Sequence, residues 1–132
     1  MREDGVGSER ASDLDRSAEE GRRRVREALA GFEDVEERLS HGEAAWFVRG
    51  GRQVAMFADR HHDDRVAVWI AAAPGAQEAL TAAQPGRYFR PPYVGHRGWV
   101  GAYLDTDCDW EAIGGLLALA VELARASGRR RA

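Results

Sequence analysis

The sequence predicts an α+β fold in which an antiparallel β-sheet carries its helices on one side. Short apolar runs with strand-like alternation fill the middle of the chain, and glycine or proline pairs separate them. Segments with helical periodicity lie before and after these runs. The expected order of elements is therefore helix, three strands, helix, strand and helix.

The first helix is expected to begin near Ser17, a residue type that caps helix N-termini. Val25 and Leu29 then lie one turn apart on an apolar stripe. Residues 1–16 are charged and almost free of large apolar groups, so their composition predicts a disordered tail. A single domain over residues 17–128 is expected, with an acidic connector after the first helix.

A β-hairpin is expected next, because apolar runs at residues 44–48 and 54–58 flank Gly50-Gly51. Two consecutive glycines suit the positive φ angles of a two-residue type I′ turn. Residues 66–72 follow as a third strand, in which Val66, Val68 and Ile70 alternate with smaller residues and Trp69.

The second half of the chain adds a helix, a strand and a final helix. Pro74 suits the first turn of a helix that runs to about Ala83. Residues 88–94 contain two prolines, which cannot donate ladder hydrogen bonds, so this segment is expected at a sheet edge or in a loop. A strand at residues 98–104 precedes the last helix. That helix is capped by Asp107 or Asp109, ends at Gly128, and has an apolar face formed by Trp110, Ile113, Leu116, Leu117, Ala120, Val121 and Ala124.

Composition limits the cellular setting and the chemistry of the chain. Its 132 residues, 44% of them apolar, suit one domain with its own core. No apolar stretch reaches the length of about 18 residues that suggests a membrane span. The charged N-terminus does not look like a secretory signal. Cys108 is the only cysteine, so no disulfide forms within the chain, and a cytoplasmic protein with no membrane partner is expected.

All 19 basic residues are arginine, which is typical of the codon usage of a GC-rich bacterial genome. The net charge of −3 and the pI of about 5.8 argue against strong, indiscriminate binding to nucleic acid. Charge is unevenly distributed, however, since residues 41–104 contain seven arginines against five acids. The middle of the chain is therefore mildly basic, between acidic flanks.

No catalytic, metal or cofactor site is predicted. The sequence His61-His62-Asp63-Asp64 has metal-capable side chains, but no second ligand pair has a recognised spacing, so a solvated loop is expected. Cys108 lacks any motif that would pair it with a histidine. No nucleophilic serine motif or phosphate-binding loop occurs. A non-enzymatic protein is expected.

The four tryptophans are expected mainly in the core, and Trp99 is the exception. It lies in a glycine-rich segment beside His96, where small residues let a partner approach the backbone. Tyr93, His96 and Trp99 are therefore candidates for a small-molecule or protein-binding pocket.

One segment also carries a family resemblance. Residues 91–105 read PPYVGHRGWVGAYLD, and Asp109-Trp110-Glu111 opens the last helix. With residues 31–37 (GFEDVEE) and the hairpin around Gly50, this pattern resembles the MmcQ/YjbR family over residues 18–126. The resemblance implies a CyaY-like fold and a non-enzymatic protein that contacts the backbone of duplex DNA through two β-hairpin wings.

By position, the resemblance places the first wing at Arg49 and Arg52 and the second at His96 and Arg97. The candidate phosphate contacts are then Arg49, Arg52, Arg87, Arg90 and Arg97. Weak DNA binding by a monomer or weak homodimer is expected. A CyaY-like shape also suggests iron, as in frataxins, but the acidic run at residues 33–37 is better explained as a solvated surface. DNA binding predicts that the arginines share one face, whereas ligand binding predicts a concave apolar pocket.

Overall fold

Residues 2–131, the part of the chain that the computed structural model describes, form a six-stranded sheet and three α-helices; side chains are described for residues 8–127. The elements along the chain are α1 (Arg2–Leu29), β1 (Val35–Ser40), β2 (Glu43–Val48), β3 (Gln53–Asp59), β4 (Val66–Ile70), α2 (Ala76–Ala83), β5 (Tyr88–Phe89), the 3-10 turn η1 (Gly95–Arg97), β6 (Val100–Tyr103) and α3 (Trp110–Arg131).

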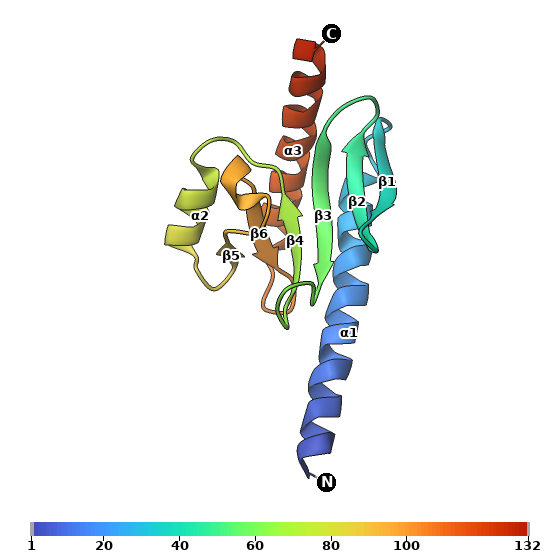
Figure 1. Cartoon of the computed structure of the whole chain (residues 1–132), viewed down its shortest axis with the longest axis vertical. Helices are drawn as coiled ribbons and strands as arrows, with labels where there is room; N and C mark the ends of the chain where they lie inside the picture. The colour runs from blue at the N-terminus through green and yellow to red at the C-terminus, as the bar shows by residue number, and fades with distance from the viewer. Residues whose placement is uncertain (1, 132) are drawn as a thin grey trace.

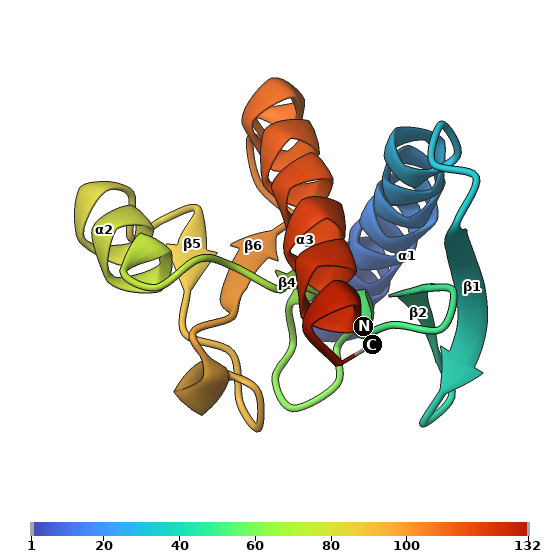
Figure 2. The ribbon, with the colours of Figure 1, turned by 90° about the horizontal axis from the view of Figure 1, so that it is seen from above.

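The sheet is antiparallel throughout, with the strand order β1-β2-β3-β4-β6-β5 (Figure 1). Helices α1 and α3 lie on the same side of it, and α2 stands beside β5 (Figure 2). The predicted α+β class with an antiparallel sheet is confirmed. No helix in the described part of the chain is long and apolar enough to cross a bilayer.

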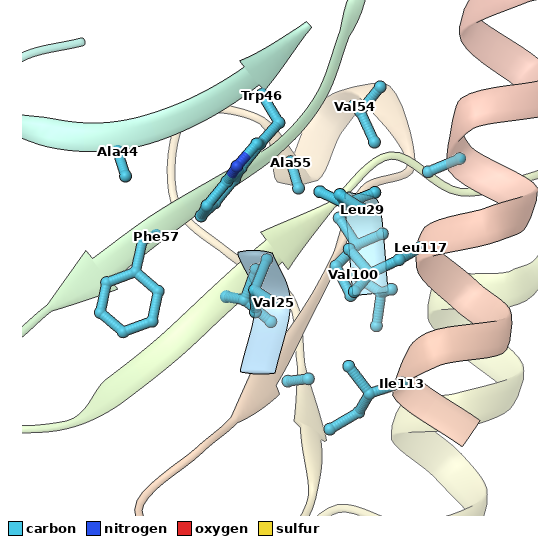
Figure 3. Close-up of a cluster of buried hydrophobic side chains, with 14 of the residues drawn as sticks. Val25, Leu29, Ala44, Trp46, Val54, Ala55, Phe57, Val100, Ile113 and Leu117 are labelled. Atoms are coloured by element: carbon cyan, nitrogen blue, oxygen red, sulfur yellow. The ribbon is translucent and has the colours of Figure 1, made fainter. Parts of the chain in front are cut away.

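The main core fills the space between the sheet and helices α1 and α3 (Figure 3). The helices contribute Val25 and Leu117, both fully buried, and Phe57 of β3 lies opposite them. Alternation on β4 is as predicted, because Val68 faces this core while Ala67 and Trp69 face the other side, and β6 shows the same pattern around Val100. Period-2 patterning therefore identified both faces of the central strands.

Strand β1 was not predicted, since its sequence VEERLS reads as an acidic connector. It lies at the sheet edge and pairs with β2 through a tight turn at His41-Gly42, where φ is +52° and +81°. These two positive angles are those of a type I′ turn. Glu37 of β1 has partners on other elements: it accepts a hydrogen bond from the Trp46 indole (3.1 Å) and forms an ion pair with Arg26 (2.8 Å).

The hairpin at Gly50-Gly51 is confirmed, but its predicted type I′ turn is wrong. Only Gly50 has a positive φ, of +70°. The Gly51 amide donates to the Val48 carbonyl (2.8 Å), and the Val48 amide donates to the Arg52 carbonyl (3.1 Å). The loop therefore has three residues, because a bulge between Trp46 and Phe47 shifts the register of β2 against β3.

Both terminal helices are longer than the sequence suggested. Helix α1 begins at Arg2 and so includes the segment that composition assigned to a disordered tail. Leu14 packs against the main core, and Asp15 forms an ion pair with Arg60 of the β3–β4 loop (2.6 Å). Helix α3 continues past Gly128 to Arg131, since one glycine weakens a helix by only about 1 kcal/mol and need not end it.

The sheet face opposite the two long helices carries a second, smaller cluster of buried residues. Trp69 and Trp99 are its large members, and the segment from Phe89 to Val94 packs over them. The β4–β6 register sets Trp69 beside Gly101, and β5 sets Phe89 on the other side of that glycine. This cluster covers the β5 half of the face, and a cavity remains beside it over β3 and β4.

Candidate functional site

Carboxylates neutralise most arginines of the protein. Within residues 8–127, every arginine lies within 4.0 Å of an Asp or Glu oxygen except Arg52, Arg90 and Arg97. All three belong to the set predicted to contact phosphates. A guanidinium without a carboxylate partner can bind an external anion without first breaking an ion pair.

These three arginines lie at one end of the sheet. Arg52 immediately precedes β3, Arg90 follows β5, and Arg97 precedes β6. Strands β3 and β6 run in the same direction, opposite to β4, so both start at the upper end of the sheet in Figure 1. Strand β5 is antiparallel to β6, and it therefore finishes at that end.

The side chains of Arg97 and Arg90 each pack against a neighbouring residue. The guanidinium carbon of Arg97 lies 5.4 Å from the centroid of the Trp99 ring, within cation–π range. The stem of Arg90 covers Gly95 so closely that a Cβ built on this glycine would lie 2.7 Å from Arg90 Cγ. Both side chains remain exposed to solvent.

The other two predicted arginines are already bound within the protein. Arg49 pairs with Glu36 (3.0 Å) and donates to the Glu33 carbonyl (3.1 Å). Arg87 pairs with Asp107 (3.3 Å), beyond the other end of β6. The structure therefore does not gather all five arginines at one place: Arg49 shares the turn of Arg52 but is neutralised, and Arg87 lies at the opposite end of the sheet.

A cavity of about 460 Å³ lies on the open face of the sheet. Residues of the strands form its floor. The β1–β2 turn, the β3–β4 loop and the segment before η1 form its rim. The lining residues are Ser40, His41, Gln53, Met56, His61, His62, Trp69, Tyr93 and Val94. This volume is within the range of about 300–1,000 Å³ typical of ligand pockets. We call this cavity the open-face pocket.

Aromatic rings form one wall of the open-face pocket. The ring of His62 lies 4.9 Å from that of Tyr93 in an edge-on arrangement and stacks at 6.4 Å on Trp69. Tyr93 is 70% exposed and has a φ of +63°, which a residue with a Cβ rarely adopts. Backbone strain of this kind lowers stability, so the surrounding structure must maintain it. Strained residues are often found at binding sites.

One residue that lines the open-face pocket, Gln53, has an unsatisfied side-chain donor. Gln53 Nε2 is buried and has no hydrogen-bond partner among the described residues. Leaving a buried N–H unpaired costs about 1–3 kcal/mol, and an acceptor on a bound molecule removes that cost. The pocket is lined by no Asp or Glu side chain.

Of the predicted ligand-binding residues, only Tyr93 lines the open-face pocket. Trp99 is 4% exposed, with its ring in the second cluster and its carbonyl accepting a hydrogen bond from Gln77 (2.6 Å). His96 is exposed but lies outside the lining. The structure groups Tyr93 with His61 and His62 instead. The sequence offered no signal for this grouping, because the β3–β4 loop and Tyr93 are about 30 residues apart.

Other titratable groups are structural. Burial raises the pKa of Cys108, whose thiol donates to the Thr106 carbonyl (3.2 Å). Burial acts to raise the pKa of Asp105 as well. Hydrogen bonds from Arg65 and the Val66 amide outweigh this effect, so the net pKa of Asp105 is below its ordinary value. No group of three or more His, Cys, Asp or Glu in the described residues is arranged to hold a metal ion.

Comparison with known proteins supports the fold and identifies the family. The crystal structure of Deinococcus radiodurans protein DR2400, with the domain DUF419, superposes with a TM-score of 0.64 at 19% identity, covering 74% of this chain and 73% of that chain. No curated protein matches the sequence. The family model named YjbR matches residues 30–122, well over half of the chain, and confirms the resemblance found in the sequence. The chain therefore belongs to the YjbR family.

Proposed function

We propose that this YjbR domain is a non-enzymatic DNA-binding protein that contacts the DNA backbone through Arg52, Arg90 and Arg97. The observation that carries the proposal is that these are the arginines of residues 8–127 without a carboxylate partner, and that they share one end of the sheet. Phosphate oxygens are the natural partners of such guanidinium groups.

The same geometry revises the predicted wings. The β2–β3 turn contributes Arg52, and the segment around η1 contributes Arg97, as the family resemblance implies. Arg49 and Arg87 contribute less, because each would exchange an ion pair within the protein for a phosphate. With about three phosphate contacts and a net charge of −3, binding is weak and sensitive to salt.

A charge-matched pair of variants tests the proposal. Replacing Arg52, Arg90 and Arg97 together by Gln should weaken binding of a fluorescent duplex at low salt by about tenfold or more, because all three phosphate contacts are lost. The control replaces Arg10, Arg16 and Arg23 of α1 by Gln, which changes net charge equally, and should leave affinity within about twofold. Equal loss in both variants would show that only net charge matters, and no binding by the wild type would reject the proposal.

The open-face pocket supports a second candidate, a small-molecule-binding domain. Its volume of about 460 Å³, its aromatic wall and the unpaired Gln53 donor are the features expected of a preformed ligand site. Trp69 lies in the pocket wall, so binding should change tryptophan fluorescence. Ligands that quench wild-type emission should lose this effect in the Tyr93→Ala variant.

A further inference from the structure

We propose that the open-face pocket receives one unpaired nucleobase from a strand whose phosphates lie on Arg52, Arg90 and Arg97. This inference rests on the proposed function and deepens it, since it assigns a base site to a protein otherwise expected to read only the DNA backbone. The preferred nucleic acid is then single-stranded or locally unpaired.

Several residues that line the pocket are close neighbours of the three arginines in the sequence. Gln53, in the pocket lining, directly follows Arg52. Tyr93 and Val94, also in the lining, lie between Arg90 and Arg97. A strand bound at the arginines therefore lies next to residues that line the pocket.

The lining suits a flat, neutral, heteroaromatic ring. The exposed ring of Tyr93 offers a stacking surface, with His62 against it and Met56 on the strand below. Stacking on an aromatic side chain is the usual way in which proteins hold unpaired bases, and it tolerates any base. Because no acidic side chain lines the pocket, nothing there repels the neighbouring phosphates.

Hydrogen bonding favours a base over a purely apolar ring. Gln53 lines the pocket and its Nε2 has no acceptor, so a rotation of its side chain would let it donate to a base; every nucleobase carries a ring nitrogen or carbonyl oxygen that accepts. His41 and His61 add ring nitrogens at the rim, which can donate or accept. In a duplex these base edges are paired and stacked, so a base must leave the helix to enter.

The test compares two strands that differ only in their bases. One is an oligonucleotide of twelve thymidines, and the other has the same length and phosphates but abasic tetrahydrofuran units. We expect wild-type protein to bind the thymidine strand about tenfold more tightly. Tyr93→Ala should abolish this preference while leaving affinity for the abasic strand unchanged. Gln53→Met, which removes the donor at similar size, should reduce it, and Leu39→Ala, at an exposed apolar residue outside the pocket, should not.

The outcomes separate this inference from the proposed function. Equal binding of both strands by the wild type would overturn the base site while leaving the phosphate contacts intact. A preference for bases that survives Tyr93→Ala would also overturn it, because the base would then bind elsewhere. If neither strand nor a duplex binds, the proposed function fails as well. Circular dichroism of each variant checks that loss of binding is not loss of fold.

Discussion

At the scale of single residues, close contacts decide which positions tolerate change. Gly101 is the clearest example, because the ring of Phe89 lies directly over its Cα. A Cβ built there would be 2.3 Å from Phe89 Cζ, a distance that real side chains do not adopt. Phe89 in turn stacks on Tyr103 at 4.4 Å, so it cannot move without disturbing the second cluster.

Gly101→Ala should therefore lower the free energy of unfolding by about 1–3 kcal/mol, as expected for overpacking. Gly115→Ala is the matched control: a Cβ there meets nothing within 4 Å, and alanine in a helix interior should raise stability by about 0.5–1 kcal/mol. Denaturant unfolding of both variants measures the difference. Opposite signs are predicted, and a neutral Gly101→Ala would mean that the Phe89 ring lies elsewhere.

Asp105 provides a pH-dependent prediction. Its folded pKa is lowered by Arg65 and the Val66 amide, against the opposing effect of burial. The group therefore stabilises the fold above its unfolded pKa of about 3.9, and this contribution is lost as pH falls through the lower folded value. Asp105→Asn should destabilise the protein at pH 7 and flatten the fall in stability below pH 4. Glu78→Gln, at an exposed residue, should leave the acid limb of the stability curve unchanged.

At the scale of elements, the sequence predicted correctly those strands and helices whose apolar residues alternate or recur at helical spacing. Strand β4 alternates valine and isoleucine with alanine and tryptophan, and α3 repeats its apolar residues at helical spacing. Strand β1 has neither signal: its Glu36 pairs with Arg49 of the β2–β3 turn, and its Glu37 pairs with Arg26 of α1. Such long-range pairing is not encoded in a local window of sequence.

Leu117 tests the assignment of the α3 face. It is fully buried between α3 and the sheet, as the periodicity predicted, and Leu119 on the same helix is 46% exposed. Leu117→Ala should cost about 2–5 kcal/mol through lost burial and a residual cavity. Leu119→Ala should cost less than about 1 kcal/mol in the same urea titration. Similar values for both would contradict the packing of the last helix.

The N-terminal part of α1 is tested by truncation. Deleting residues 1–12 removes an exposed ion pair between Arg10 and Asp64, so stability should change by less than about 1 kcal/mol. Deleting residues 1–16 also removes Leu14, which packs against the core, and should cost more than that. Thermal unfolding compares the two. Equal stability would support a domain that begins at residue 17.

At the scale of the whole molecule, the candidate site is assembled from parts that are distant in sequence. The β1–β2 turn, the β3–β4 loop and the segment around Tyr93 meet only because the strand order places β6 beside β4. Sequence reasoning identified the arginines and Tyr93, but it could not place Gln53 or His62 beside them. It also could not tell which arginines are neutralised, since their partners come from other elements.

The salt dependence of DNA binding tests the central claim most directly. If Arg52, Arg90 and Arg97 each neutralise one phosphate, the logarithm of the association constant should fall against the logarithm of salt concentration with a slope of about −3. Arg52→Gln should bring that slope to about −2, because one contact fewer releases one counterion fewer. Arg16→Gln, on α1, should leave it unchanged. A wild-type slope near zero, or a slope that Arg52→Gln does not alter, would contradict the account.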